Sequence, residues 1–203
     1  KEASIVVHPT KSHQTATLSN GISHYFRSKG YKKKVRFVNR LDMDTTGLLI
    51  VAKNPYAHQQ MAVQFENNQV HKKYYAIVEG LVEKDNDSLD FPIGREEERS
   101  IRKTVRPGGQ NALTKYRVLE RYKNASLLDI QIFTGRSHQI RVHLSHIGHP
   151  IIGDHLYNSK SDYIDRQSLH SYFLGIKGIR DKESIELKTQ LPEDMKELIE
   201  KLK

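Results

Sequence analysis

The chain has 203 residues, with 33 Lys and Arg against 24 Asp and Glu, a formal net charge of +9 and a pI near 9.6. This length is enough for one substantial hydrophobic core or two small ones, and the excess of cations fits either a polyanionic partner, most simply a nucleic acid, or a generally basic soluble protein. The absence of cysteine excludes disulfides, thiolate metal sites and a cysteine nucleophile.

The ends and the hydropathy of the chain limit its surroundings. No apolar segment is long enough to span a bilayer, and the opening residues KEASIVVHPTK do not resemble a signal peptide. We therefore expect a cytoplasmic protein. Because the sequence begins at Lys1 and not at Met, we also expect it to be a piece of a longer chain.

The first quarter of the chain predicts two strands and two helices. Ser4–Pro9 is typical of a short strand that ends at proline, and residues 18–26 have apolar positions at helical spacing with Gly30 as the stop. The run GLLIVA, Gly47–Ala52, predicts one buried strand because its apolar residues are continuous. Asn54–Pro55 then predicts the start of a second helix, with proline in its first turn.

The middle of the chain predicts strands and hairpins. Lys72–Gly80 is expected to form a strand. Asp85–Gln110 is polar and carries both signs of charge, so we expect hairpins and loops there. In Ser126–Phe133 apolar and polar residues alternate, which predicts a strand with one buried face.

The last third predicts two helices. Ser137 is a candidate N-cap for a helix that ends at Gly148, with an apolar stripe formed by Ile140, Leu144 and Ile147. Leu191–Lys203 predicts a C-terminal helix with one apolar side. Since there is no repeat and no linker, one mixed α+β domain over residues 1–203 is the economical interpretation.

An acidic run, NRLDMDTTG, stands directly before the predicted buried strand. Asp42 could simply make a turn or cap there. Asp42, Asp44 and Gly47 also resemble the start of an EF-hand calcium loop, but Lys53 occupies the twelfth position, where that loop needs a bidentate Glu. A cation at that position rules out the calcium motif.

A phosphatase is a second alternative for the same run. Asp42-x-Asp44-x-Thr46 resembles the nucleophile motif of haloacid-dehalogenase-type phosphatases, with Gly153–Asp154 as a candidate for the second, magnesium-binding part. In that family the aspartate follows an apolar strand, whereas here the strand comes after it. We therefore rank the magnesium-dependent phosphatase low.

Histidines are dense between residues 138 and 155, and His143 and His146 are three residues apart. No third histidine or carboxylate completes a zinc pattern. Histidines beside arginines on a basic chain fit phosphate contacts or helix capping better, so we expect no metal.

Several motifs together resemble the RluA-type pseudouridine synthase family. The first is Asn39-Arg40-Leu41-Asp42-Met43-Asp44-Thr45-Thr46-Gly47, similar to the family's H-R-L-D-x-x-T-S-G. Lys72-x-Tyr74-x-Ala76-x-Val78-x-Gly80 is similar to a second element, and the runs from Gly135 to Leu144 and from Gly148 to Tyr157 are similar to a third. Leu169–His170 and Leu191–Asp194 are similar to the closing elements. The departures are Asn39 in place of histidine, Thr46 in place of serine, and an opening without Lys-Pro-x-Gly.

This resemblance implies a fold and an activity. The fold would be α+β, with a mixed, largely antiparallel sheet flanked by helices and loops. The activity would be isomerisation of specific uridines in RNA to pseudouridine without a cofactor, in ribosomal or transfer RNA, by a monomer. Many members carry a small S4-type RNA-binding domain before the catalytic one, and these 203 residues leave no room for it.

The resemblance also assigns roles to residues. Asp42 would be the catalytic carboxylate, either attacking C1′ of the ribose or assisting proton removal at C2′, with Arg141 as its ion-pair partner. Tyr74 would pack on the target base and act as acid or base for the C5 proton. Tyr75, its neighbour on the strand, would point to the opposite face.

The expected RNA contacts are made by cations around these residues. Arg40 would fill the gap left by the flipped uridine or hold its phosphate, and Arg136, His138 and Lys72 would contact the substrate backbone. Plain solvated cations are the alternative for these side chains. A catalytically lapsed RNA-binding module stays open as the competing class, because it would show the same charge and fold.

Overall fold

One mixed sheet organises the molecule. The computed structural model describes residues 1–11 and 13–203. The sheet has the strand order β11-β10-β4-β9-β8-β5, and the short β2 pairs with β10 in parallel while the other neighbours are antiparallel. Its strands are β2 (Thr46–Gly47), β4 (His71–Glu79), β5 (Asn86–Asp90), β8 (Leu113–Arg121), β9 (Ala125–Ile132), β10 (Leu169–Lys177) and β11 (Ser184–Lys188). The predicted α+β fold with a largely antiparallel sheet is confirmed.

Two short ladders stand outside this sheet. β1 (Arg36–Phe37) pairs with β3 (Val51–Ala52), and β6 (Ile93–Arg95) pairs with β7 (Lys103–Val105). Of the hairpins expected between residues 85 and 110, one is present, β6–β7, whereas β5 pairs with β8 beyond this range.

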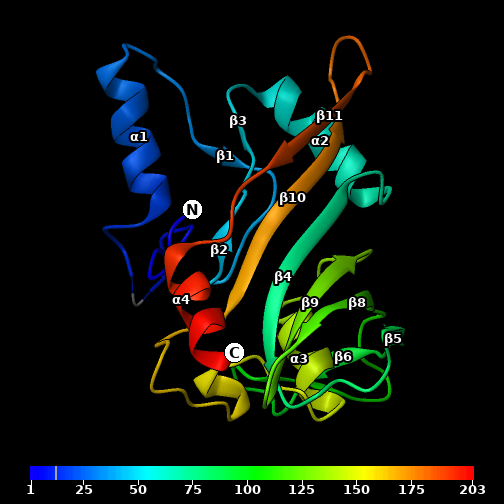
Figure 1. Cartoon of the computed structure of the whole chain (residues 1–203). Coiled ribbons are helices and arrows are strands. Elements are labelled where there is room, and N and C mark those ends of the chain that lie inside the picture. Colours follow the sequence, from blue (N-terminus) through cyan, green and yellow to red (C-terminus); the bar gives the residue numbers. More distant parts are fainter. Residues whose placement is uncertain (12) are drawn as a thin grey trace.

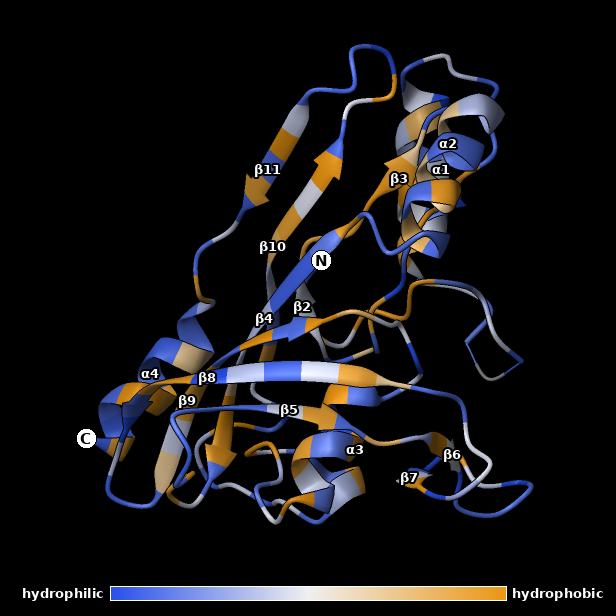
Figure 2. Ribbon diagram, turned by 90° about the vertical axis from the view of Figure 1, so that its right-hand side faces the viewer, coloured by the Kyte–Doolittle hydropathy of each residue, from blue (hydrophilic) through white to orange (hydrophobic). Residues whose placement is uncertain are grey.

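The two faces of the sheet carry different helices. Along β4, Tyr74, Ala76 and Val78 belong to a core cluster shared with α3 (Gln139–His146), whereas Ile77 belongs to a cluster shared with α4 (Glu193–Leu202). Figure 1 shows β4 and β10 side by side as the long central strands. Figure 2 shows hydrophobic and hydrophilic residues mixed along α3 and α4, as expected for helices with one buried side.

The two N-terminal helices form where the sequence predicts them. α1 (Leu18–Ser28) begins with a capping box between Thr17 and Asn20. α2 (Pro55–Glu66) begins after Asn54, whose side chain accepts a hydrogen bond from the Ala57 backbone N at 2.7 Å. These caps satisfy N–H groups that have no partner inside the helix.

Two of the strand predictions are wrong. Ser4–Pro9 forms no strand; the Val6 and Val7 carbonyls instead accept from the backbone N–H groups of Leu18 and Ser19, at 2.9 and 3.1 Å. Gly47–Ala52 is split between β2 and β3, which pair with different strands, and residues 48–50 between them are only half-buried. The continuous apolar run therefore reflects a crossing between two sheets and not one buried strand.

Gly47 is required by the contact between β2 and β10. Its φ is +117°, and an added Cβ would lie 2.2 Å from the Ser171 carbonyl oxygen. We expect Gly47→Ala to lower the free energy of unfolding by about 3 kcal/mol or more, because a rigid strand backbone would have to move. Urea denaturation checks this. Gly21→Ala in α1, where nothing lies within 4 Å, is the control and is expected to be neutral or slightly stabilising. Equal losses in the two variants would contradict the argument.

Candidate active site

The Asp42 loop connects β1 to β2 and is held by the C-terminal half of the chain. Thr46 and Gly47 pair with His170 and Ser171 of β10, and Thr46 Oγ1 lies 2.7 Å from His170 Nδ1. A tight turn closes the loop, because the Thr45 backbone N donates to the Asp42 carbonyl at 3.1 Å. The loop is therefore fixed to β10, an inner strand of the sheet, within a few residues of Asp42.

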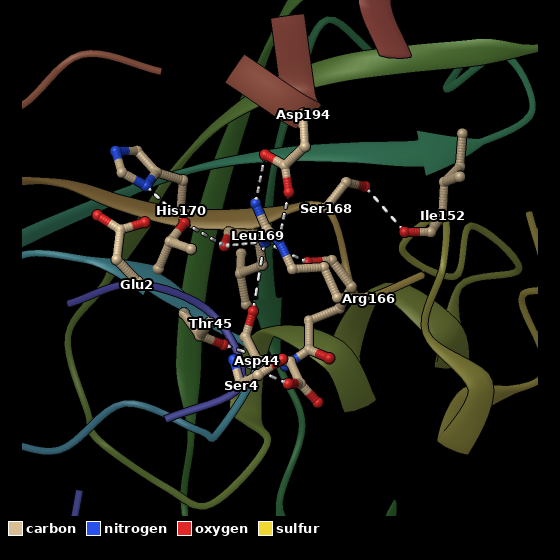
Figure 3. A network of polar contacts seen from close by, with 12 residues as sticks. Glu2, Ser4, Asp44, Thr45, Ile152, Arg166, Ser168, Leu169, His170 and Asp194 are labelled. Atoms are coloured by element: carbon tan, nitrogen blue, oxygen red, sulfur yellow. Dashed lines mark hydrogen bonds and ion pairs between the residues drawn. The ribbon is translucent and has the colours of Figure 1, made fainter. Parts of the chain in front are cut away.

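Arg166 ties the same loop to α4. Its guanidinium makes a two-pronged ion pair with Asp194, at 2.7 and 2.8 Å, and Nη1 also donates to the Asp44 carbonyl at 3.3 Å. Figure 3 shows Arg166 between Asp194 above it and the Asp44 loop below. A buried cation thus links the Asp42 loop to the C-terminal helix.

Asn39, where the family motif has histidine, has a contact that explains its position. Its side-chain oxygen accepts a hydrogen bond from the Ile50 backbone N at 2.8 Å. Val38 N also donates to the Ile50 carbonyl at 3.0 Å. The departure from the motif therefore adds a brace at the entrance of the loop.

Arg141 lies between two carboxylates. Its Nε and Nη2 donate to both oxygens of Asp154, at 2.7 and 2.8 Å, and its Nη1 donates to Asp42 Oδ2 at 2.9 Å. The side chains of Arg141 and Asp154 are 8% and 1% exposed, whereas that of Asp42 is 32% exposed. Asp154 is the buried anchor, and Asp42 is the carboxylate that reaches the solvent.

The charge of Arg141 is secured by this arrangement. Burial works to lower the pKa of Arg141, but the hydrogen bonds and charges of Asp154 and Asp42 outweigh it and raise the pKa above the ordinary arginine value. The guanidinium also packs on the Tyr157 ring, 5.1 Å from its centre. Because both Asp154 oxygens face Arg141, the geometry does not match a second metal-binding part of a phosphatase site.

Tyr74 presents its ring to the same space from β4. It is buried, and burial is the main cause that raises the pKa of its phenol to about 12, with the Asp42 charge acting in the same direction and Ser171 opposing it. The phenol is therefore protonated at neutral pH. Tyr75 points to the other face, where it stacks on Tyr172 with ring centres 3.8 Å apart, as predicted.

A cavity of about 350 Å³ brings the predicted residues together. Its lining includes every candidate named from the sequence, namely Arg40, Asp42, Lys72, Tyr74, Arg136, His138 and Arg141. The volume suits a ligand of nucleoside size. The cations outnumber Asp42, so the cavity favours an anionic ligand. Lys73, by contrast, alternates to the other face of β4 and lies 5.7 Å from the Phe173 ring centre.

The cations of this cavity are held in different ways. Arg40 donates to Ser137 Oγ at 2.7 Å, and Arg136 Nε donates to the Asn111 carbonyl at 3.0 Å; both arginines are exposed. Lys72 is buried, which lowers its pKa, and its ammonium lies 5.7 Å from the Phe65 ring centre. Arg40 and Arg136 can therefore contact a ligand's backbone outside the cavity, whereas Lys72 can contact only a group inside it.

The predicted N-cap of α3 is wrong. His138 and not Ser137 occupies the cap, with φ of 57° and no side-chain capping bond. The Ser137 hydroxyl is taken by Arg40, and the turn is closed by Gln139, whose Oε1 accepts from the Arg136 backbone N at 3.0 Å. A left-handed histidine costs roughly 1 kcal/mol, and such strain is concentrated at functional sites.

The sequence analysis assigns no role in the pseudouridine synthase site to two residues that contact it, Asp154 and Tyr157. Asp154 appears there only as a magnesium candidate, and Tyr157 only as the end of a motif. Both lie in the GDHLY run around the short 3₁₀ helix η1 (His155–Tyr157), so the motif was the one available signal.

The dense histidines mostly make structural hydrogen bonds. His143 is buried, and its ring lies 3.0 Å from both Thr114 Oγ1 and the Phe91 carbonyl. His149 Nδ1 donates to the Glu79 carbonyl at 2.8 Å. Across residues 1–11 and 13–203, no group of three or more His, Asp or Glu side chains is placed to hold a metal ion.

Comparison with known proteins decides the family. The family model described as RNA pseudouridylate synthase matches residues 1–146. The chain belongs to the RNA pseudouridylate synthase family. The resemblance to RluA-type pseudouridine synthases inferred from the sequence is thereby confirmed, and so is the assignment to an isomerase family that acts on RNA.

Individual relatives agree with this assignment. The chain is 42% identical to the RNA pseudouridine synthase YlyB of Bacillus subtilis (strain 168), and 34% identical to the ribosomal large subunit pseudouridine synthase D of Haemophilus ducreyi (strain 35000HP / ATCC 700724). The matches cover all of this chain and 68% and 66% of those two proteins. The chain thus spans about two thirds of the length of these relatives.

Solved structures of the family have the same architecture. The human RNA pseudouridylate synthase domain containing 4 has a TM-score of 0.79 and 26% identity, covering 100% of this chain and 87% of that one. The human RNA pseudouridylate synthase domain containing 1 has a TM-score of 0.77, also at 26% identity, covering 100% of this chain and 88% of that one.

In the described parts of this chain, no helix has both the length and the apolar character needed to cross a membrane.

Proposed function

We propose that this chain isomerises uridine to pseudouridine in RNA and that Asp42 is its catalytic carboxylate. The observation that carries the proposal is the row of hydrogen bonds from Asp154 through Arg141 to Asp42, because it fixes one partly exposed carboxylate in a cavity of nucleoside size. Arg141 Nη1 donates to Oδ2 of Asp42, so Oδ1 is the oxygen that we assign to the substrate.

The reaction needs no outside reagent. The C1′–N1 bond breaks, the base turns, a C1′–C5 bond forms, C5 loses its proton and N1 gains one, so atoms and electrons balance within the nucleotide. Asp42 either attacks C1′ or takes a proton from C2′ to start this sequence. Both routes require an ionised carboxylate held at a fixed position, and Arg141 supplies the fixing charge and fork geometry.

The base is expected to enter the cavity unstacked. An enzyme that acts on a base within RNA must extrude the nucleotide. We assign the flanking phosphates to Arg40 and Arg136, which line the cavity and are exposed. Binding of RNA should therefore weaken steeply with salt. We propose that the enzyme works in the cytoplasm, which agrees with a chain without cysteine.

Large-subunit ribosomal RNA is the substrate that we propose, and transfer RNA is the second candidate. The support comes from the names of three relatives, each a ribosomal large subunit pseudouridine synthase D, which match at 32–35% identity. The experiment is to incubate the chain with unmodified transcripts of both RNA classes and to map pseudouridine. Formation in transfer RNA alone would overturn the ribosomal assignment. Binding without product on every RNA would support the lapsed RNA-binding module.

Tyr74→Phe tests the role of the phenol. We expect a loss of roughly 10²–10⁴-fold in kcat, the usual size for a removed acid or base, with RNA affinity nearly unchanged because the ring still packs on the base. Tyr75→Phe is the matched control, since it lies next along β4 but stacks on Tyr172 on the opposite face. The activities of both variants are measured as release of tritium from RNA labelled with 5-³H-uridine, since C5 loses its hydrogen in the reaction. A Tyr74→Phe rate equal to that of Tyr75→Phe would limit Tyr74 to packing.

A further inference from the structure

His138 stands across the cavity from Asp42 and is held there. Its ring Nε2 lies 3.9 Å from Asp42 Oδ2, and its side chain is 18% exposed. The backbone at His138 is left-handed, with φ of 57°, directly before α3. The His138 side chain lines the cavity and makes no capping hydrogen bond to the helix.

The other ring nitrogen faces a buried phenol. Tyr157 Oη lies 3.1 Å from His138 Nδ1 and accepts a hydrogen bond from the Lys103 backbone N at 3.0 Å. A backbone N–H can only donate, so the hydrogen of the phenol must find its own acceptor. Among the polar contacts of Tyr157 that the structure gives, His138 Nδ1 is the atom that can accept it. Nδ1 is then unprotonated, and Nε2 carries the hydrogen toward the cavity.

Burial favours the neutral form of the His138 ring. Burial is the largest cause and lowers the pKa of His138, Asp42 and Asp154 act to raise it, and Arg141 and Lys103 act to lower it further, with a lowered pKa as the outcome. Burial also raises the pKa of Tyr157 to about 12, so the phenol keeps its hydrogen. At neutral pH, His138 Nε2–H is thus an uncharged hydrogen-bond donor that lies in the cavity beside the Asp42 carboxylate.

We propose that His138 donates this Nε2–H to O2 of the target uracil, and that Tyr157 is a positioning residue that fixes the donating tautomer. The inference rests on the proposed function, because Asp42 must lie against C1′ or C2′, and O2 is the carbonyl oxygen on C2, the ring atom bonded to N1. When the C1′–N1 bond breaks, its electron pair passes to the ring and part of the charge collects on O2. A fixed donor stabilises that charge while keeping its own proton.

Substitutions at position 138 test the donor. Removing one such donor typically lowers kcat about 10²–10³-fold, which we expect for His138→Ala, with KM little changed. Gln places an amide N–H near the position of Nε2, whereas Asn places it near that of Nδ1. His138→Gln should therefore retain at least about ten times the rate of His138→Asn. Equal rates for Gln, Asn and Ala would overturn the donor.

A change in the substrate tests the acceptor. Transcripts of large-subunit ribosomal RNA are made with 5-³H-uridine or with 5-³H-2-thiouridine, in which a poorly accepting sulfur replaces O2. The wild type should slow on the thio transcript, while His138→Ala should work equally on both. Because the same RNA meets both proteins, effects of sulfur on RNA folding cancel in the ratio of their rates. An equal slowing of both proteins would overturn the assignment to O2.

Tyr157→Phe tests the positioning part separately. In ¹⁵N NMR of histidine-labelled protein, the wild type should show Nδ1 of His138 unprotonated, and Tyr157→Phe should show a mixture of tautomers. A loss of thermal stability with an unchanged tautomer would overturn the positioning role and leave packing alone. The NMR result does not need turnover, so a wild type that forms no pseudouridine would defeat the proposed function and still leave this test readable.

Discussion

Asp42→Asn should lower tritium release from 5-³H-uridine RNA on the order of 10⁴-fold or more, as expected when the reacting group itself is removed. An amide can neither attack C1′ nor take a proton from C2′. The position of the side chain is kept, because Arg141 remains anchored by both oxygens of Asp154. RNA affinity and its dependence on salt should therefore stay close to those of the wild type.

Asp44→Asn is the matched control for this loss. Asp44 lies two residues further along the same loop, but its carboxylate accepts from the Ser4 backbone N at 3.2 Å and is absent from the cavity lining. We expect a rate within about threefold of the wild type, because surface substitutions of this kind usually change free energies by only about 0.5 kcal/mol. EDTA should change neither rate. Asp42→Asn at the wild-type rate would remove Asp42 from the chemistry, and inhibition by EDTA would reopen the metal-dependent alternative.

Asp154→Ala is expected to have the largest effect on stability in this site. It would leave Arg141 buried with only Asp42 as a partner, and breaking a buried ion pair from one side typically costs about 3–5 kcal/mol. Tritium release should fall as well, because the guanidinium that holds Asp42 loses its anchor. Urea denaturation gives the free energy of unfolding, and the midpoint shift at constant slope is the quantity to compare.

Asp85→Ala supplies the control for Asp154→Ala. Asp85 accepts from Arg121 Nη2 at 2.6 Å, but the side chains of Arg121 and Asp85 are 37% and 78% exposed. Its loss should cost about 1 kcal/mol or less, in the range of solvent-accessible ion pairs. The double variant Arg141→Met with Asp154→Leu should regain much of the stability and stay inactive. Equal losses for the two alanine variants would contradict the anchoring role of Asp154.

The sequence predicts those elements whose burial follows a local period. β4, β9, α1, α2 and α4 have alternating or helical spacing and are present at or within a few residues of the predicted bounds. β10 has no such pattern. Its residues are buried on both faces and include His170 and Ser171, so its place in the sheet depends on its partners β2, β4 and β11. A pattern within a short segment of the sequence cannot predict pairing between strands that are far apart in the chain.

The site shows the same division. The resemblance leads to seven residues that line one cavity, because each lies inside a motif with a fixed order of residue types. Asp154 and Tyr157 act through the guanidinium of Arg141 and the ring of His138, which only the folded loop before η1 brings near. A motif can point to such residues, but their contacts depend on where the loop lies.

The order of these contacts along the chain has a consequence for biosynthesis. Asp42 leaves the ribosome 99 residues before Arg141. Asp154, Ser171 and Asp194, which also hold its loop or its partner, emerge later still. Folding domains form during synthesis as their parts become available. The cavity can therefore close only after Asp194 has been synthesised, and a nascent chain that stalls before Asp194 carries Asp42 on a loop that lacks its final anchor.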